Sequence, residues 1–154
     1  MMLRERLNER LKSAMKDKDS RAVSTLRLIL TAIKDRDIAA RGKGESDGIA
    51  EPEILQVLQT MIRQRQDAIK LYEQGGRLEL AQQESEEIAI IEEFLPEQLD
   101  EAAVETAIRE VVLEVGAKSI KDMGKAMAEL RKRYAGQMDF GKASATLKEQ
   151  LNAL

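Results

Sequence analysis

The chain has 154 residues, of which 34% are charged and only 3% are aromatic, and it contains neither Cys nor His. The absence of Cys excludes disulfides, thiolate catalysis and zinc–thiolate sites, and the absence of His removes the side chain best suited to proton transfer near neutral pH. A length of 154 residues suits one domain or two small ones, and 43% hydrophobic residues with few aromatics are typical of amphipathic helices. We therefore expect an all-α protein.

The formal net charge of −3 conceals a division along the chain. Residues 1–76 carry 15 basic and 12 acidic side chains, residues 77–115 carry 2 and 12, and residues 116–154 carry 8 and 4. Because salt screens charges over roughly 8 Å at physiological ionic strength, a local basic face acts largely by itself. The net charge therefore does not exclude an RNA partner.

The beginning of the chain gives no sign of export. Residues 1–18 mix Glu5, Glu9 and Asp17 with basic side chains, which is typical neither of a secretory signal nor of an acid-poor transit peptide. No apolar stretch approaches the roughly 20 residues that span a bilayer. We expect a cytoplasmic protein with no membrane partner.

Apolar residues at helical spacing predict two helices in the first third of the chain. The first covers residues 2–16, with one face formed by Leu3, Leu7, Leu11 and Met15. Asp19 or Ser20 can cap the second, which ends near Ala40 and has its apolar positions at Val23, Leu26, Ile29, Leu30 and Ile33. A loop with three glycines follows at residues 41–48.

The segment from Ile54 to Leu95 predicts a long helical hairpin. Its first arm covers residues 51–74, with Pro52 in the first turn, where no amide partner is needed. Gly75 and Gly76 permit the left-handed backbone that ends a helix, and Pro96 cannot continue the second arm. Such a hairpin buries apolar surface and offers neither Cys nor His as a nucleophile or metal ligand.

Three shorter helices are predicted after Pro96. Asp100 caps one that ends at Gly116, and Ser119 with Asp122 forms a capping box for the next, which ends before Gly136. The last contains Phe140, Ala143, Leu147 and Leu151. Since a proline and a reversal of local charge coincide between Leu95 and Asp100, we place an N-terminal helical domain at residues 1–96 and a C-terminal three-helix domain at 97–154.

Fragments spread over nearly the whole chain resemble the GatB/YqeY family, and within it the stand-alone YqeY-like proteins. Each fragment is weak alone, and their order and spacing together make the resemblance specific. They include Arg6-Leu7-Asn8, Thr25-Leu26-Arg27, Ala32-Ile33-Lys34, Arg63-Gln64-Arg65-Gln66, Gly75-Gly76-Arg77, Glu93-Phe94-Leu95-Pro96 and Asp122-Met123-Gly124-Lys125.

The resemblance implies an N-terminal helical domain followed by a small C-terminal three-helix domain. In the amidotransferase subunit GatB a related region lies at the C-terminal end, where its tail contacts tRNA while a separate domain performs ATP-dependent activation. The family label of a carbon–nitrogen ligase with glutamine as amido donor would describe that complex. No Gly-rich phosphate loop of the P-loop kind is present here, and we assign no catalytic residue, metal site or cofactor.

A basic cluster in the C-terminal part is the candidate nucleic-acid-binding site. Lys and Arg favour phosphate oxygens because neutralising these charges releases counterions, and the start of a helix near Ser119 adds amide donors. The alternative is a solvated helix face without a ligand. With few aromatics for base stacking, contact with the backbone of a folded tRNA fits better than single-strand binding. The candidate residues are Lys121, Lys125, Arg131, Lys132, Arg133 and Lys142.

Three further features have competing interpretations. For Gly124 we favour close packing between helices over approach of a sugar–phosphate backbone. For Arg65, which lies on an apolar stripe, we favour an ion pair with Glu84 or Glu87 over an interaction site, because a buried charge must be paired. The acidic run of the hairpin's second arm is interpreted as a solvated face, not as a catalytic or cation site; it comprises Glu84, Glu86, Glu87, Glu92 and Glu93.

Two functions remain open from the sequence. The first is a tRNA-associated accessory or binding module with a possible protein partner in translation and a possible link to tRNA-dependent amidation; we expect no DNA partner. The second is a protein-interaction module that docks through the long hairpin, without RNA. An exposed apolar stripe on the hairpin would favour the second.

Overall fold

The computed structural model describes residues 2–44 and 47–154, which form helices joined by turns, with no strand among the residues described. The chain divides into two compact units, Met1–Leu95 and Pro96–Leu154, each with its own cluster of buried hydrophobic residues. The expected all-α class is confirmed. The division lies one residue from the expected boundary, and independent folding of each part stays a prediction.

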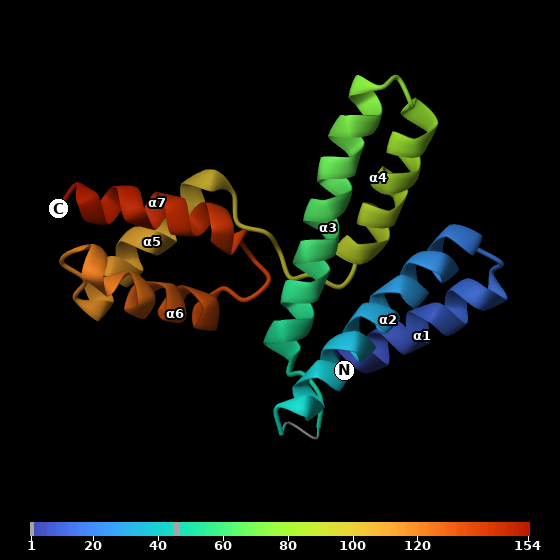
Figure 1. Ribbon diagram of the computed structural model, residues 1–154, viewed down its shortest axis with the longest axis horizontal. Coiled ribbons are helices and arrows are strands. Elements are labelled where there is room, and N and C mark those ends of the chain that lie inside the picture. Colours follow the sequence, from blue (N-terminus) through green and yellow to red (C-terminus); the bar gives the residue numbers. More distant parts are fainter. Residues whose placement is uncertain (1, 45–46) are drawn as a thin grey trace. The chain divides into compact units, whose positions relative to one another are not determined.

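The first unit contains four helices: α1 (Leu3–Lys16), α2 (Ser20–Gly42), α3 (Glu51–Gln74) and α4 (Leu78–Glu92). α3 and α4 form an antiparallel hairpin, α1 packs along α2, and α2 packs against α4 (Figure 1). The side chains that fill the space between them recur at helical spacing. Five that have no exposed surface are Leu7, Leu26, Ile29, Leu58 and Ile91.

The helix ends in this unit have local causes. The Asp19 carboxylate accepts the Ala22 N–H at the start of α2, and Gly76 has a φ of +71° in the turn between α3 and α4. α4 ends at Glu92, three residues before the expected end at Leu95. The N–H groups of the next three residues bond to carbonyls three positions back instead of four. This tighter, 3₁₀-type hydrogen bonding ends the α-helix.

A charged cluster holds Ile49, at the end of the loop before α3. The Arg4 guanidinium donates to both Asp37 carboxylate oxygens at 2.8 Å and to the Ile49 carbonyl at 2.9 Å, while the Ile49 N–H donates to Asp37 at 2.8 Å. The hydrogen bonds from Arg4, helped by the Ile49 N–H and opposed by burial, lower the pKa of Asp37 from 3.8 to about 2. This cluster, the Arg4–Asp37 clamp, joins α1, α2 and the approach to α3.

Arg65 is held between α3 and α4. Its side chain is 13% exposed, and its Nε lies 3.2 Å from a Glu87 oxygen and 3.9 Å from a Glu84 oxygen. The expected ion pair is confirmed. The solvated interpretation of the acidic run is wrong for these two carboxylates, since both are half-buried against Arg65. Burial and the nearby charge of Glu87 raise the pKa of Glu84.

The second unit packs α5 (Glu101–Val115), α6 (Met123–Arg133) and α7 (Phe140–Asn152) against one another, with a 3₁₀ turn at Ile120–Asp122 before α6. Side-chain caps begin each part. The Asp100 carboxylate accepts the Ala103 N–H, Asp139 accepts from two amides of α7, and Ser119 with Asp122 forms the predicted capping box.

The segment after Leu95 is hydrogen-bonded to the second unit. The Leu99 N–H donates to the Gln137 carbonyl at 2.9 Å, and the Gln98 side-chain amide donates to the Gly136 carbonyl. Both acceptors lie in the turn between α6 and α7. The residues that precede α5 are therefore part of the second unit's own structure.

Candidate nucleic-acid interface

The six predicted basic residues gather around α6, and all of them are exposed. α6 buries Ala126, Met127 and Leu130 against its neighbours, which leaves its remaining faces to charged side chains. Lys121 lies in the 3₁₀ turn before the helix, and Lys142 lies in the first turn of α7. The helix itself carries Lys125, Arg131, Lys132 and Arg133.

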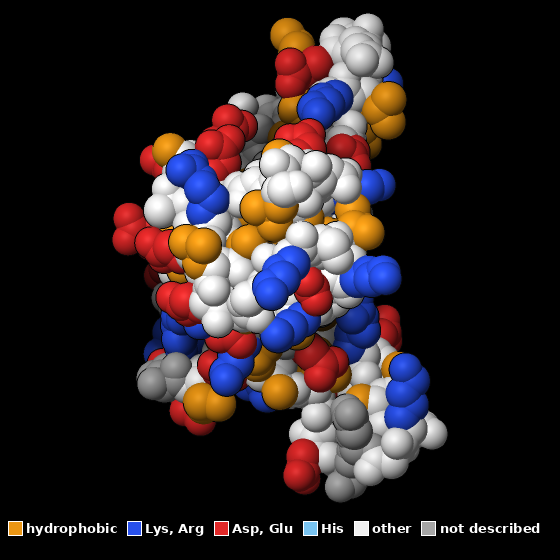
Figure 2. All heavy atoms as spheres, turned by 90° about the vertical axis from the view of Figure 1, so that its left-hand side faces the viewer, with side chains coloured by type: hydrophobic (Ala, Val, Ile, Leu, Met, Phe, Trp, Pro, Cys, Tyr) orange, Lys and Arg blue, Asp and Glu red, His pale blue; other side chains and the backbone are white. Residues whose placement is uncertain are grey.

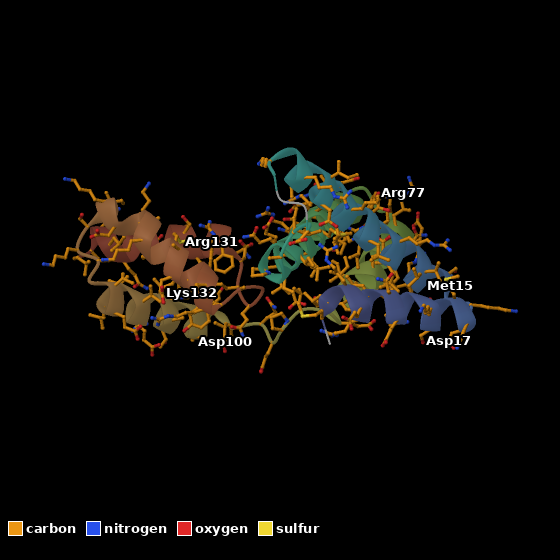
Figure 3. The ribbon with its side chains drawn as sticks, turned by 90° about the horizontal axis from the view of Figure 1, so that it is seen from below. Met15, Asp17, Arg77, Asp100, Arg131 and Lys132 are labelled. Atoms are coloured by element: carbon orange, nitrogen blue, oxygen red, sulfur yellow. The ribbon has the colours of Figure 1, made fainter. Side chains whose placement is uncertain are left out.

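These side chains leave α6 in different directions. Successive residues of a helix are rotated by about 100°, so Lys125 and Lys132, seven positions apart, share the face opposite the core. Arg131 instead lies beside α7, with its guanidinium carbon 5.8 Å from the centre of the Phe140 ring. Figure 3 labels Arg131 and Lys132 on this helix.

Arg133 is paired with two glutamates of the same unit at the surface. Its guanidinium forms an ion pair with Glu114 of α5 and a 2.7 Å hydrogen bond with Glu129, one turn earlier on α6. These hydrogen bonds raise the pKa of Arg133 above its ordinary value. The Arg133 side chain therefore links α6 to α5. In this it differs from Lys121, Lys125 and Lys132, which form no such ion pair among the described residues.

The start of α6 is open. Gly124 is exposed, and a methyl group built at this position would have no atom within 4 Å apart from its chain neighbours and the backbone of its own helix. The packing interpretation is therefore wrong, because nothing in the described chain lies against this glycine. A glycine inside a helix costs about 1 kcal/mol relative to alanine, and no steric demand of the fold explains it.

One carboxylate lies among the lysines at this end of α6. Asp122 accepts the backbone N–H groups of Lys118 and Ser119 at 2.8 and 3.4 Å, and these bonds lower its pKa. Lys118 is exposed near Lys121 in the sequence and was missed by the sequence reasoning. A basic residue just before the capping Ser119 was the signal that could have identified it.

The basic character of this unit is local. Residues 96–154 carry nine Lys and Arg and ten Asp and Glu, and four of the glutamates belong to α5. Figure 2 shows Lys and Arg side chains interspersed with Asp and Glu side chains over the face of the whole chain that it presents. Any attraction of a polyanion therefore depends on the lysines of α6 and its neighbouring turns, not on the charge of the whole unit.

A groove of about 520 Å³ lies between α5 and α7. Its walls are mainly apolar, and the charged groups at it include Glu105 and Arg109, which face each other at 3.9 Å. Within the described part of the chain, no three acidic side chains converge on a possible metal position. In the same residues, no helix combines the length and the apolar character needed to cross a membrane.

Comparison with known families covers almost the whole of this fold. The family model described as "Yqey-like protein" matches residues 4–151, which include both units and every residue of the candidate interface. The chain belongs to the YqeY-like family. The resemblance drawn from the sequence fragments is thereby confirmed.

Relatives of this YqeY-like chain are found in yeasts. A Candida glabrata protein named "Altered inheritance of mitochondria protein 41, mitochondrial" is 33% identical over 59% of the chain and 48% of that protein. A Kluyveromyces lactis protein of the same name is 27% identical over 92% of the chain and 72% of that protein. An uncharacterized Schizosaccharomyces pombe protein is 30% identical over 62% of the chain and 71% of that protein. The chain spans about half the length of the first of these relatives.

These names contradict the expected cytoplasmic location, because the named relatives are mitochondrial proteins. The expectation rested on the composition of residues 1–18, which lacks the features of a secretory or transit segment. Such a composition shows only that residues 1–18 do not resemble a secretory signal or an acid-poor transit peptide. It gives no physical reason for a protein to stay in the cytoplasm, and the inference is therefore corrected.

Proposed function

We propose that the second unit of this YqeY-like protein binds the phosphate backbone of structured RNA, with a folded tRNA as the favoured partner. Lys121, Lys125 and Lys132 are exposed, and among the described residues none of them forms an ion pair within 4 Å. Binding a phosphate would cost these lysines no internal partner. The resemblance to the tRNA-contacting tail of GatB supports the same partner.

The open backbone at Gly124 is the observation that carries this proposal. A sugar–phosphate chain can approach a helix closely only where no side chain intervenes, and Gly124 leaves such a space empty at the start of α6. Lys121 lies three residues before Gly124 and Lys125 directly follows it, so both lysines start within about one helical turn of the approaching phosphate. A solvated face without a ligand would gain stability from alanine at this position and has no use for glycine.

The six residues take different parts in this proposal. Lys121, Lys125 and Lys132 contact phosphate oxygens directly, and Lys142 adds charge from the start of α7. Arg131 stacks on Phe140 and keeps donors free for a further contact. Arg133 contributes by holding α6 on α5 through Glu114.

A link with tRNA-dependent amidation belongs to the same proposal. The tail of GatB contacts tRNA while a separate domain performs the ATP-dependent activation, and a module that holds tRNA through its backbone would act likewise. We assign no step of ATP activation or amide transfer to a residue of this chain. The protein partner in translation that this proposal implies would supply that chemistry.

The test is a titration of the full chain against labelled, folded tRNA at several salt concentrations, followed by fluorescence anisotropy. We expect the logarithm of the affinity to fall linearly with the logarithm of salt concentration. The double variant Lys125→Ala/Lys132→Ala should weaken binding and reduce that slope by about 2, one for each lost phosphate contact. Gly124→Ala should weaken binding without changing the slope.

The matched control removes an arginine and a lysine of the first unit, Arg63→Ala/Lys70→Ala, which are seven positions apart on α3 and exposed. It should leave both affinity and slope unchanged. Absence of binding at low salt would overturn the proposal. An unchanged affinity for Lys125→Ala/Lys132→Ala would remove the site from α6.

The hairpin gives the second candidate function. Leu71 and Leu78 are 68% and 67% exposed on either side of the turn that joins α3 to α4, and this turn stands away from α1 and α2 (Figure 1). Exposed leucines of this kind favour a protein partner. If the titration finds no RNA binding, docking through this turn becomes the better account of the fold.

A further inference from the structure

The side of α2 that faces away from the core carries an unusual mixture of residues. α2 buries Ala22, Leu26, Ile29 and Ile33 among others, so the opposite side of the helix is open to solvent. On that side Leu28 is 48% exposed and Ile38 is 54% exposed. We define the α2 outer face by six of the helix's exposed residues, which are Arg27, Leu28, Thr31, Lys34, Ile38 and Arg41.

The outer face has a cationic edge. Arg27, Lys34 and Arg41 follow one another at intervals of seven, and seven residues complete almost two turns, so these cations lie along one edge of the helix over about 20 Å. Thr31 and Ile38 lie beside this edge, rotated by about 40° and about 20° from Arg27. Leu28 lies further round at about 100°, and the exposed Asp35 lies between Ile38 and Leu28. A cationic edge with exposed aliphatic side chains beside it can pack against another helix.

The cations of this edge are not used by the fold. Among the described residues, Arg27 and Lys34 have neither an ion pair nor a hydrogen bond from their side chains, whereas Arg21 of the same helix lies 3.3 Å from Glu86. Arg41 acts on Asp37 only through space, because Arg4 occupies both oxygens of that carboxylate. The positive charge along the edge is therefore available to a partner.

We propose that the α2 outer face binds an amphipathic helix of a partner protein, with Glu or Asp along the edge that meets Arg27, Lys34 and Arg41. Acidic side chains at seven-residue spacing would pair with these cations, and small aliphatic side chains beside them would cover Leu28 and Ile38. Charge complementarity along one edge also fixes the direction of the partner helix.

The same residues argue against other occupants. A phosphate backbone would place Leu28 and Ile38 against charged oxygens. A lipid surface would gain too little from two aliphatic side chains. This site lies in a different unit and takes a different class of partner from the proposed RNA interface, and neither proposal depends on the other.

The probe is a synthetic amphipathic helix with a leucine strip and glutamates along one edge at seven-residue spacing. A second peptide replaces these glutamates by lysines and is otherwise identical. Fluorescence anisotropy of each labelled peptide is followed on addition of the full chain. We expect the acidic peptide to bind at least about tenfold more tightly than the basic one.

A charge reversal on the protein makes this test specific. Arg27→Glu/Lys34→Glu should bind the acidic peptide about tenfold or more weakly than the unmodified chain and bind the basic peptide more tightly. The charges on the protein are then reversed, so they repel the acidic peptide and attract the basic one. Arg63→Glu/Lys70→Glu, the same charge change at the same spacing on α3, should leave the preference as in the unmodified chain. Leu28→Ser/Ile38→Ser should weaken the binding of both peptides, and the acidic peptide should still bind more tightly than the basic one.

The possible results separate cleanly. Reversal of the preference by the α2 variant alone supports the proposal. No binding of the acidic peptide, or an equal effect of the α3 control, overturns it. Binding of duplex RNA or of anionic vesicles that Arg27→Glu/Lys34→Glu abolishes, with no binding of either peptide, would also overturn it and assign the face to those partners. tRNA binding through α6 can fail or succeed independently of each result.

Discussion

Gly124 and Gly116 are two exposed glycines of the second unit with different conformational demands. Gly116 ends α5 with a φ of +69°, a left-handed backbone that side chains other than glycine rarely adopt, whereas Gly124 has an ordinary helical backbone. Neither has an atom within 4 Å of the position where a methyl group would stand. Any difference between alanine at the two sites therefore reports on the backbone alone.

We predict opposite effects on stability at these two positions. Gly124→Ala should raise the free energy of unfolding of the second unit by about 0.5–1 kcal/mol, because alanine loses less backbone entropy in a helix. Gly116→Ala should lower it by about 1 kcal/mol, because it places a side chain in the left-handed region. Urea unfolding of the full chain with a probe in the second unit measures both.

A stable Gly124→Ala variant that binds RNA less well would show that glycine is kept for contact. Loss of stability on this substitution would contradict the open surroundings described for Gly124. The comparison with Gly116 controls for general effects of an added methyl group.

The sequence could identify Gly124 as unusual but not its surroundings. A glycine inside a helical pattern needs a physical reason. Close packing between helices and close approach of a ligand both require glycine, so the sequence alone does not distinguish them. The same limit applied to Arg133, whose partner Glu114 lies on another helix. Local spacing predicted Lys121, Lys125 and Lys132 as exposed cations, but only the arrangement of three helices separates them from Arg133.

At the scale of the elements, the Arg4–Asp37 clamp connects three parts of the first unit. Gly48, with a φ of +83°, brings the loop so close that a methyl group there would lie 2.6 Å from the Asp37 carboxylate. Sequence reasoning found neither the clamp nor its role, because Arg4 and Asp37 are 33 residues apart and each belongs to an amphipathic helix with many charges. Caps such as Asp19, Asp100 and Ser119 were predictable because their partners lie within a few residues.

The clamp predicts a dependence of stability on pH. Since the pKa of Asp37 is about 2 in the folded protein and its ordinary value is 3.8, its contribution is complete above about pH 4 and is lost as the pH falls toward 2. The shift corresponds to at most about 2.5 kcal/mol. Solvent reduces this figure, because the Arg4 side chain is 39% exposed.

Thermal unfolding of the full chain between pH 2 and 5 measures this contribution. Asp37→Asn should be less stable at pH 5 and should show a flatter decline on acidification. Asp35→Asn, an exposed neighbour on α2, is the control and should follow the unmodified chain. Parallel pH curves for Asp37→Asn and the unmodified chain would contradict the role of the clamp.

At the scale of the whole molecule, the two clusters of buried residues share no member. Leu26 in the first and Leu147 in the second are both without exposed surface. The sequence predicted this organisation from a proline and a change of charge near residue 96, since each part had enough apolar positions for a core. It could not predict which charged faces would remain unpaired, because that depends on the packing of helices distant in sequence.

We predict that the two units lose stability separately. Leu26→Ala and Leu147→Ala should each cost about 2–5 kcal/mol, because each leaves a cavity in a closely packed core. Hydrogen exchange of the full chain should show faster exchange only in residues 2–95 for the first variant and only in residues 96–154 for the second. Faster exchange in both units from either substitution would show that they unfold together.

The hydrogen bonds from Gln98 and Leu99 to the turn between α6 and α7 set a limit on any shortened form of the second unit. A fragment starting at Asp100 would leave the carbonyls of Gly136 and Gln137 without these donors, next to Asp139, which caps α7. The turn would then be free to fray, and α7 with it. A truncation, a protease cut or a fusion junction between Leu95 and Gln98 keeps these donors with the turn, whereas one after Leu99 removes them.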